Sequence, residues 1–215
     1  MRTGPQSTSI EPSQTPYHHG DLRAALIRAG EEELNEKGVE AFSLRGCAKR
    51  AGVSHAAPAH HFGDTRGLLT ALATEGFRAF VATQQAAMDE AAIDPASQLA
   101  AAGLGYVRFA LSRPALFRLI FSSDKPNFDN RDLETAATAA YELLVAQIGS
   151  VCGTAPELED IAAVWSAAHG LADLLAAGRL KSVLALPLPQ RDAMILRIVM
   201  RALPPASLRP QPAPR

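Results

Sequence analysis

Two cysteines among 215 residues are too few for a disulfide framework, so nothing in the sequence requires an oxidising environment. No apolar run approaches the roughly 20 residues of a membrane helix, and the first residues lack the apolar core of a signal peptide. The sequence also has no glycine-rich phosphate loop, no GxSxG and no HExxH. We therefore expect a cytoplasmic protein that is not an enzyme and does not enter a membrane.

An excess of charge of one sign is missing as well. The 21 Lys and Arg residues and 22 Asp and Glu residues give a formal net charge of −1. Binding to nucleic acid therefore cannot be argued from the whole chain, and any basic surface must be local. Hydrophobic residues make up 47% of a chain long enough for one or two domains, which indicates a globular protein with a sizeable core.

The charge becomes one-sided in a single stretch, residues 41–62. This stretch contains no carboxylate, three cationic side chains and three of the six histidines, namely Arg45, Lys49, Arg50, His55, His60 and His61. A polyanionic phosphate backbone would attract such a segment and repel an acidic one.

The residue pattern of the same stretch predicts two short helices around a turn. Ser43 is suited to cap the first helix, and its apolar face follows at helical spacing as Leu44, Cys47, Ala48 and Ala51. Gly52 stands where a left-handed residue would end that helix, and Ser54 is predicted to cap the second. Two short helices with a glycine turn are typical of a helix-turn-helix, although an ordinary helical hairpin would have the same pattern.

Several short motifs then follow one another in a specific order. They are Tyr17-His18-His19-Gly20-Asp21-Leu22-Arg23, Phe42-Ser43-Leu44-Arg45, Arg50-Ala51-Gly52-Val53-Ser54, His60-His61-Phe62-Gly63-Asp64 and Gly67-Leu68-Leu69. In this order, over roughly residues 17–80, they resemble the N-terminal DNA-binding domain of the TetR/AcrR family of bacterial transcriptional regulators. Trp165 with His169-Gly170 is similar to a family branch whose C-terminal domain carries a Trp…His-Gly signature.

The resemblance implies an all-α chain of about nine helices. A three-helix, helix-turn-helix DNA-binding domain is expected at 17–63, and a helical bundle for effector binding and dimerisation at 64–203. Composition adds an arm at 1–16, rich in Ser, Thr, Pro and Gln, and a Pro-rich tail at 204–215. Both ends are expected to be disordered.

Double-stranded DNA is the partner that the resemblance implies. The residues expected to face base edges are His55, Ala56 and Ala57. Those expected toward phosphate are Ser43, Arg45, Ser54, His60, His61 and Thr65. At the start of the first helix, His18, His19 and Arg23 are further candidates for contact with the DNA backbone.

Three positions depart from the family's pattern. The family usually has Tyr at Ala59 and Lys at Thr65, both of which hold phosphate, so we expect weaker salt dependence of DNA binding here. It commonly has Glu at Gly46, which would close a capping box with Ser43. We expect the loss of that Glu, with a helical glycine in its place, to cost on the order of 1 kcal/mol.

The predicted last helix, 188–203, is apolar almost all round, so more than one of its faces must be buried. We expect a homodimer through a four-helix bundle of 157–178 and 188–203, which the resemblance also implies. The interface residues predicted are Ala163, Ala167, Gly170, Leu174, Ile195, Ile198 and Val199. A fully enclosed central helix in a monomer is the alternative.

A surplus of aromatic residues in the C-terminal part predicts an apolar pocket for a small-molecule effector. The predicted lining is Tyr106, Phe109, Phe117, Phe121 and Trp165, with His169 as a polar group. An effector there would act through the helix at 64–92 by binding two states with different affinity. For each aromatic residue plain core packing is the alternative, and for His169 a hydrogen-bonded core position.

No cofactor and no metal is expected. A site built from His18, His19, His60 and His61 would need adjacent histidines to converge, but neighbours in a helix point about 100° apart. The acidic cluster Glu31, Glu32, Glu33 and Glu36 is interpreted as a solvated helix face.

The function predicted is a ligand-responsive DNA-binding transcriptional regulator, a repressor that a small apolar effector releases from a palindromic operator. A helical protein-interaction or small-molecule-binding module, with weak or lost DNA binding, is the alternative.

Overall fold

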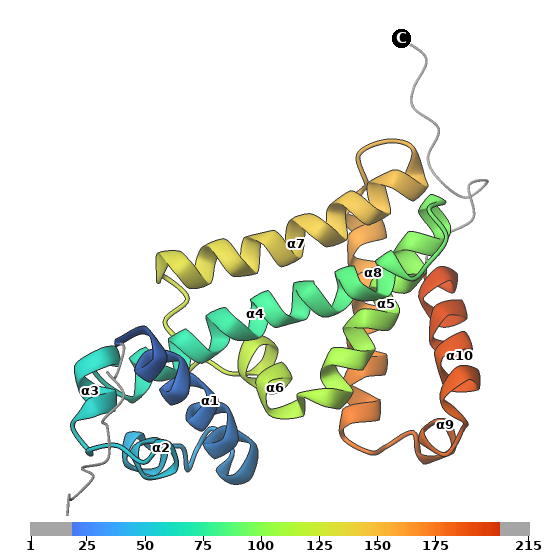
Figure 1. Ribbon diagram of the computed structural model, residues 1–215. Coiled ribbons are helices and arrows are strands. Elements are labelled where there is room, and N and C mark those ends of the chain that lie inside the picture. The colour runs from blue at the N-terminus through green and yellow to red at the C-terminus, as the bar shows by residue number, and fades with distance from the viewer. Residues whose placement is uncertain (1–18, 203–215) are drawn as a thin grey trace, which may run out of the picture.

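The computed structural model describes residues 19–202, and every regular element in that range is a helix (Figure 1). The ten helices are α1 (His19–Lys37), α2 (Leu44–Ala51), α3 (Ala57–Phe62), α4 (Thr65–Asp89), α5 (Pro95–Ser112), α6 (Pro114–Ser122), α7 (Arg131–Cys152), α8 (Leu158–Ala176), α9 (Lys181–Leu184) and α10 (Leu188–Arg201). The all-α prediction is confirmed, and the helix beyond the expected nine is the four-residue α9. The predicted arm at 1–16, the predicted tail at 204–215, His18 and the side chain of His19 lie outside the described residues.

Helices α1, α2 and α3 form a small head at one end of the molecule, and α4 leads from it into the larger helical body (Figure 1). Local signals set the helix ends as predicted. Ser43 accepts a hydrogen bond from the Gly46 N–H, 3.1 Å away, and Gly52 ends α2 with a φ of 67°. Asp64 caps α4 by accepting from the Gly67 N–H at 2.8 Å. One cap was wrong: Ser54 does not cap α3, which begins at Ala57 after a turn and has no side-chain cap.

Helix α5 is the centre of the body. Its residues 99–107 are all buried, because α4, α7, α8 and α10 pack around it. Small residues let these neighbours approach closely. At Gly105 an added Cβ would lie 2.5 Å from the Cα of Gln84 and 2.8 Å from the carbonyl oxygen of Thr83 on α4. The two helix backbones are therefore in direct contact at this point.

Helix α10 packs its apolar face onto α5 within the same chain. Ile195 is 1% exposed and Val199 is fully buried, so the prediction that these two residues lie at a dimer interface was wrong. Ile198 is half-buried and packs against the edge of the same core. The sequence correctly predicted that α10 has apolar residues on more than one face, but it did not indicate which face packs on α5.

One hydrophobic core runs from the head to the last helix. It includes Leu34 and Cys47 in the head, Leu72 in α4, Leu116 in α6 and Val199 in α10. Burial raises the pKa of the Cys47 thiol to about 12, so this group is protonated and packs as a small apolar side chain at neutral pH. Between residues 19 and 202, none of the helices has both the length and the hydropathy of a membrane span.

The contact at Gly105 leads to a stability prediction. In an ordinary helix position Gly→Ala is favourable, but Gly105→Ala must push two backbones apart. We expect the substitution to lower the free energy of unfolding by about 1–3 kcal/mol in urea titrations. Gly149→Ala on α7 is the matched control, because its Cβ would meet nothing closer than 3.4 Å, and it should be neutral or mildly stabilising. Equal effects of the two substitutions would contradict the close approach.

Candidate functional site

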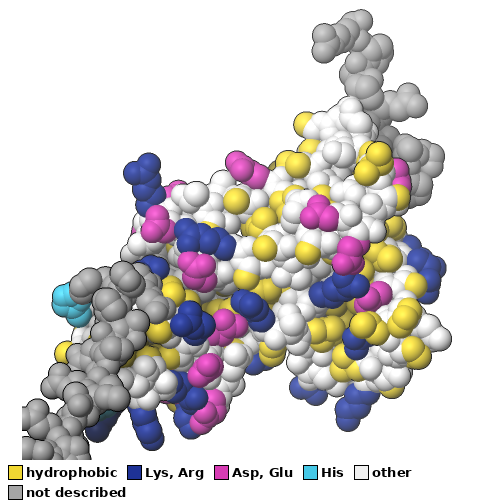
Figure 2. All heavy atoms as spheres, in the orientation of Figure 1, with side chains coloured by type: hydrophobic (Ala, Val, Ile, Leu, Met, Phe, Trp, Pro, Cys, Tyr) yellow, Lys and Arg dark blue, Asp and Glu magenta, His cyan; other side chains and the backbone are white. Residues whose placement is uncertain are grey.

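The head presents the end of α2, the following turn and the short helix α3 to solvent. Most of the predicted DNA contacts are exposed there, namely Arg45, Ser54, His55, Ala56 and His60. Ser43, Ala57, His61 and Thr65 are partly buried. Lys and Arg side chains line the outer edge of the head (Figure 2). The predicted interface residues therefore lie together on one accessible end of the protein.

A carboxylate from α1 fastens α2 to the head. Glu33 is only 5% exposed, and its Oε2 accepts a hydrogen bond from Arg50 Nε at 2.7 Å. Its Oε1 accepts from the Ser43 hydroxyl at 3.4 Å, and Arg50 also pairs with Glu36. Hydrogen bonds from Lys37 and then from Arg50 lower the pKa of Glu36 to about 2. The α2 cap and the only arginine in the last turn of α2 are thus tied to α1.

This network corrects two sequence-based interpretations. The acidic cluster of α1 is not a uniformly solvated face, because Glu33 is buried and ion-paired. Arg50 is not a free cation, because two carboxylates neutralise it. Arg45 and Lys49 are exposed, and neither has an ion-pair partner among residues 19–202. They are the basic side chains of α2 that remain available to a phosphate.

The position of Glu33 explains why residue 46 is a glycine. An added Cβ there would lie 2.0 Å from Glu33 Oε1 and 2.4 Å from Glu33 Cδ. The carboxylate that the family usually supplies from this position of α2 is replaced by one that reaches across from α1. Glu33 accepts a hydrogen bond from the hydroxyl of the cap residue Ser43, although Glu33 belongs to α1 and not to α2.

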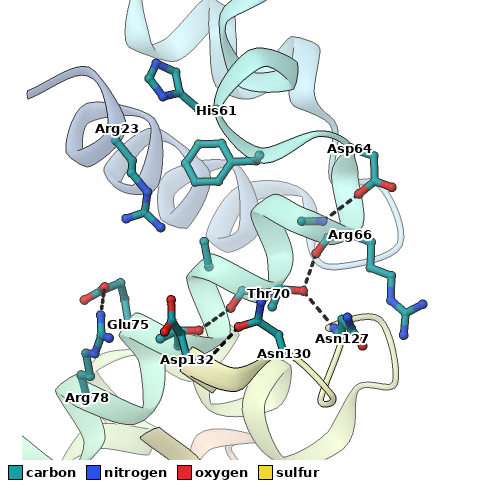
Figure 3. A pocket seen from close by; sticks show the side chains of 14 residues that line it. Arg23, His61, Asp64, Arg66, Thr70, Glu75, Arg78, Asn127, Asn130 and Asp132 are labelled. Atoms are coloured by element: carbon teal, nitrogen blue, oxygen red, sulfur yellow. Dashed lines mark hydrogen bonds and ion pairs between the residues drawn. The ribbon is translucent and has the colours of Figure 1, made fainter. Parts of the chain in front are cut away.

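A polar cleft of about 380 Å³ separates the head from the start of α7 (Figure 3). Arg23, His61 and Arg66 line it from the head side, and Asp132 of α7 and the α7 cap residue Asn130 line it from the other. His61, at the end of α3, therefore lines this cleft. The centre of its ring lies 5.4 Å from that of His60. The guanidinium of Arg23 lies 5.4 Å from the centre of the Phe62 ring, so it also stacks on α3.

One hydroxyl joins the floor of this cleft to the loop before α7. Thr70 on α4 donates to the Arg66 carbonyl at 2.7 Å and accepts from the backbone N–H of Asn127 at 2.9 Å (Figure 3). The connection fixes the α6–α7 loop to the first turns of α4, next to the head. A displacement of α6 or α7 would therefore reach the part of α4 that carries the head.

An apolar cavity of about 320 Å³ lies deeper in the body, where five helices meet. Its lining comes from α4, α5, α6, α7 and α8, and comprises Phe77, Phe80, Gln84, Tyr106, Ile120, Phe121, Ala137, Ala140, Tyr141, Leu144 and Trp165. Of the predicted pocket residues, Tyr106, Phe121 and Trp165 line it. The α4 and α7 contributors were missed, although the Phe77, Phe80 and Gln84 spacing along one face of α4 was available as a signal.

Three of the predicted pocket residues are behind the cavity instead. Phe109 is fully buried and Phe117 is 1% exposed, so both are core residues. His169 supports the cavity wall, because its Nδ1 lies 2.7 Å from the Tyr106 hydroxyl. Burial raises the pKa of Tyr106, and a hydrogen bond with Trp165 opposes this in part. Tyr106 is thus a neutral, hydrogen-bonded residue in the cavity wall. His169 fits the alternative expectation for this residue, a hydrogen-bonded position in the core.

One stripe along α8 consists of three half-buried small residues and one exposed leucine. Ala163, Ala167, Gly170 and Leu174 follow at spacings of four, three and four, which puts them on one stripe of the helix. Nothing lies within 4 Å of a Cβ added at Gly170, and Leu174 is 43% exposed. Hydrophobic side chains are exposed at the end of the molecule that carries α8 and α10 (Figure 2).

Among residues 19–202, no three His, Cys, Asp or Glu side chains converge as metal ligands would. The head offers exposed basic, hydroxyl and imidazole groups around a short helix, and the body contains a partly open apolar cavity.

Comparison with known proteins agrees with this arrangement. Residues 26–72 match the family model of bacterial regulatory proteins of the tetR family, and residues 99–201 match that of the tetracyclin repressor-like C-terminal domain. The chain belongs to the TetR family. It is therefore a DNA-binding transcription regulator with an N-terminal helix-turn-helix and a helical C-terminal domain.

Solved structures of similar fold cover almost the whole TetR-family chain. A Rhodococcus sp. RHA1 protein of unknown function is 32% identical, with a TM-score of 0.72 over 88% of this chain and 99% of its own. A TetR family transcription regulator from Marinobacter aquaeolei VT8 is 18% identical, with a TM-score of 0.65 over 86% and 96%. The transcriptional regulator FadR from Bacillus subtilis, solved with stearoyl-CoA, is 16% identical, with a TM-score of 0.62 over 84% and 99%. No curated protein matches the chain.

The Glu33 contact in this TetR-family head can be measured by a double-mutant cycle. Gly46→Ala should lower the free energy of unfolding by about 1–3 kcal/mol, because the new Cβ must displace Glu33 from Ser43 and Arg50. In a Glu33→Ala background the same substitution should instead raise it by about 1 kcal/mol, as Gly→Ala does in ordinary helices. Urea unfolding gives both values. The same sign in both backgrounds would show that Glu33 does not occupy the position of that Cβ.

Proposed function

We propose that this regulator is a homodimeric repressor that a small apolar effector releases from a near-palindromic operator. The observation that carries the proposal is the pairing of an exposed helix-turn-helix with an apolar cavity in the body, joined by the single helix α4. In this proposal residues 17–63 read DNA, and residues 64–203 bind effector and dimerise. Its place of action is the cytoplasm, where the DNA is.

Base readout is assigned to the start of α3. In a helix-turn-helix the N-terminal residues of the second helix reach base edges in the major groove. His55 and Ala56 are exposed there, so an imidazole could bond a purine and a methyl could contact thymine. Arg45 and Lys49, which lack ion-pair partners among the described residues, supply the phosphate contacts. Thr65 and Ala59 contribute less than the family's Lys and Tyr would.

Effector action is assigned to the connection between cavity and head. The cavity is lined by Phe77, Phe80 and Gln84, while the first turn of the same helix is capped beside α3 by Asp64. The Thr70–Asn127 hydrogen bond links that part of α4 to the loop after α6. A ligand that fits one arrangement of α4 and α6 better than another would change the spacing of two heads. The stearoyl-CoA complex of the FadR neighbour supports a small-molecule effector in this fold.

Dimerisation is assigned to the α8 stripe of Ala163, Ala167, Gly170 and Leu174, together with the half-buried Ile198 of α10. Small residues along one helix allow a partner helix to approach closely, and the exposed Leu174 adds apolar area. Ile195 and Val199 support this face from inside rather than forming it. Two heads held about 34–36 Å apart would match adjacent major grooves on one side of the duplex.

A gel-shift assay with the intergenic DNA beside the protein's own gene tests the DNA reading. Each phosphate contact contributes about one unit to the slope of log binding constant against log salt concentration. Arg45→Ala should weaken binding and reduce that slope by about 1, while Arg179→Ala, an exposed charge after α8, should leave it unchanged. No shift by the unsubstituted protein at low salt, with any neighbouring intergenic fragment, would refute the assignment.

The dimer is tested by placing a charge on the stripe. We expect Ala167→Glu to convert the protein to single chains at micromolar concentration in sedimentation experiments, because an unpaired carboxylate would be desolvated. DNA affinity should fall with it, since one head covers only half of the operator. Ala139→Glu, on the exposed face of α7, is the control and should keep the dimer. An unsubstituted protein that already sediments as single chains would contradict the dimer.

A further inference from the structure

One buried polar group faces the apolar cavity without a partner. Gln84 is 6% exposed and lines the cavity from α4, and its Nε2 makes no hydrogen bond in the structure. A buried donor left unpaired is costly, and such groups are rare in folded proteins. A donor that makes no hydrogen bond within the protein is therefore a candidate for a hydrogen bond to a ligand.

The fold holds Gln84 in this position. A Cβ added at Gly105 would lie 2.5 Å from the Gln84 Cα, so the α5 backbone packs directly on α4 at this residue and fixes its position. The side chain lies between the cavity and a smaller space of about 20 Å³. An acceptor in the cavity is thus in reach of a donor whose backbone is fixed.

The other polar groups of the lining do not compete for this role. The Tyr106 hydroxyl is already paired with His169. Tyr141 and Trp165 are 45% and 40% exposed, so they form the mouth rather than the interior, and their ring centres are 6.5 Å apart. Among the lining residues, Gln84 is consequently the buried one whose amide Nε2 has no hydrogen-bond partner.

The lining also excludes an ionic ligand from the interior. None of its eleven residues is charged, and burial raises the pKa of Tyr106, so no phenolate forms at neutral pH. An ion would lose its hydration there without a counter-charge. The volume of about 320 Å³ is at the lower end of ordinary small-molecule sites, so the interior suits a compact molecule.

We propose that the effector is a compact, uncharged, largely apolar molecule, on the order of 10–15 non-hydrogen atoms, with one hydrogen-bond acceptor that binds Gln84 Nε2. Aromatic edges and faces from α4, α6 and α8 pack against its apolar part. The assignment rests on the proposed function for its biological meaning, but the binding itself can be measured without DNA.

Three probes of equal non-hydrogen atom count separate the requirements. They are 2-acetylnaphthalene, which carries a carbonyl acceptor, 2-isopropylnaphthalene, which carries none, and 2-naphthoate, which carries a charge. Isothermal titration calorimetry on the full chain measures each, first with the unsubstituted protein and then with Gln84→Met. Gln85→Met, a neighbouring exposed residue on α4, is the matched control.

With the unsubstituted protein we expect the ketone to bind and 2-naphthoate to bind at least tenfold more weakly. Gln84→Met should shift the ratio of ketone to hydrocarbon affinity about tenfold toward the hydrocarbon, and Gln85→Met should leave the ratio unchanged. The thermal midpoint of Gln84→Met should not fall, because the variant removes an unpaired buried donor.

Three results would overturn the assignment. They are an unchanged affinity ratio in Gln84→Met, binding of 2-naphthoate as tight as that of the ketone, and no binding of any probe up to its solubility limit. The naphthoate comparison needs no variant, so it decides even if Gln84→Met does not fold. Ketone binding through Gln84 in a protein that never shifts DNA would refute the regulator proposal and leave this one standing.

Discussion

The backbone contact between α4 and α5 at Gly105 is the constraint on which the rest of the structure depends. Helix α4 carries the head at its beginning and one wall of the cavity further along, so its position sets both. Because Gly105 has no side chain, α5 can lie against Gln84 and Thr83 and place Tyr106 beside the cavity. The core then forms around α5, with α10 closing it from the far side.

In the head, an ion pair and its hydrogen bonds fix the position of α2, because its apolar packing face is small. The short helix α2 has a small buried face, Cys47 and Ala48, and a glycine in its first turn. Glu33 compensates by bridging the cap residue Ser43 and the last-turn residue Arg50. This pairing costs the head one basic side chain for DNA, but it holds α2 at a fixed angle to α1. The glycine at position 46 and the buried carboxylate of Glu33 are therefore two halves of one feature.

The cavity and the head are connected through shared helices rather than through direct contact. Gln84 and Asp64 are on the same helix, and Thr70 between them binds the loop that follows α6. Ile120 and Phe121 of α6 line the cavity, while α6 also packs against α1. In the proposed function, a change in cavity occupancy would have two routes to the head, one through the first turns of α4 and one through α1.

The sequence by itself determined the local features: the helices, most of their ends, and the turn before α3. Ser43, Gly52 and Asp64 act within a few residues of their position, so their roles follow from chain-local geometry. Tertiary structure alone decided that Glu33 meets Arg50, that Val199 faces inward, and that Gln84 is left unpaired. These outcomes depend on the angles at which helices cross, and a periodic pattern gives a helix its faces without saying which neighbour each face will meet.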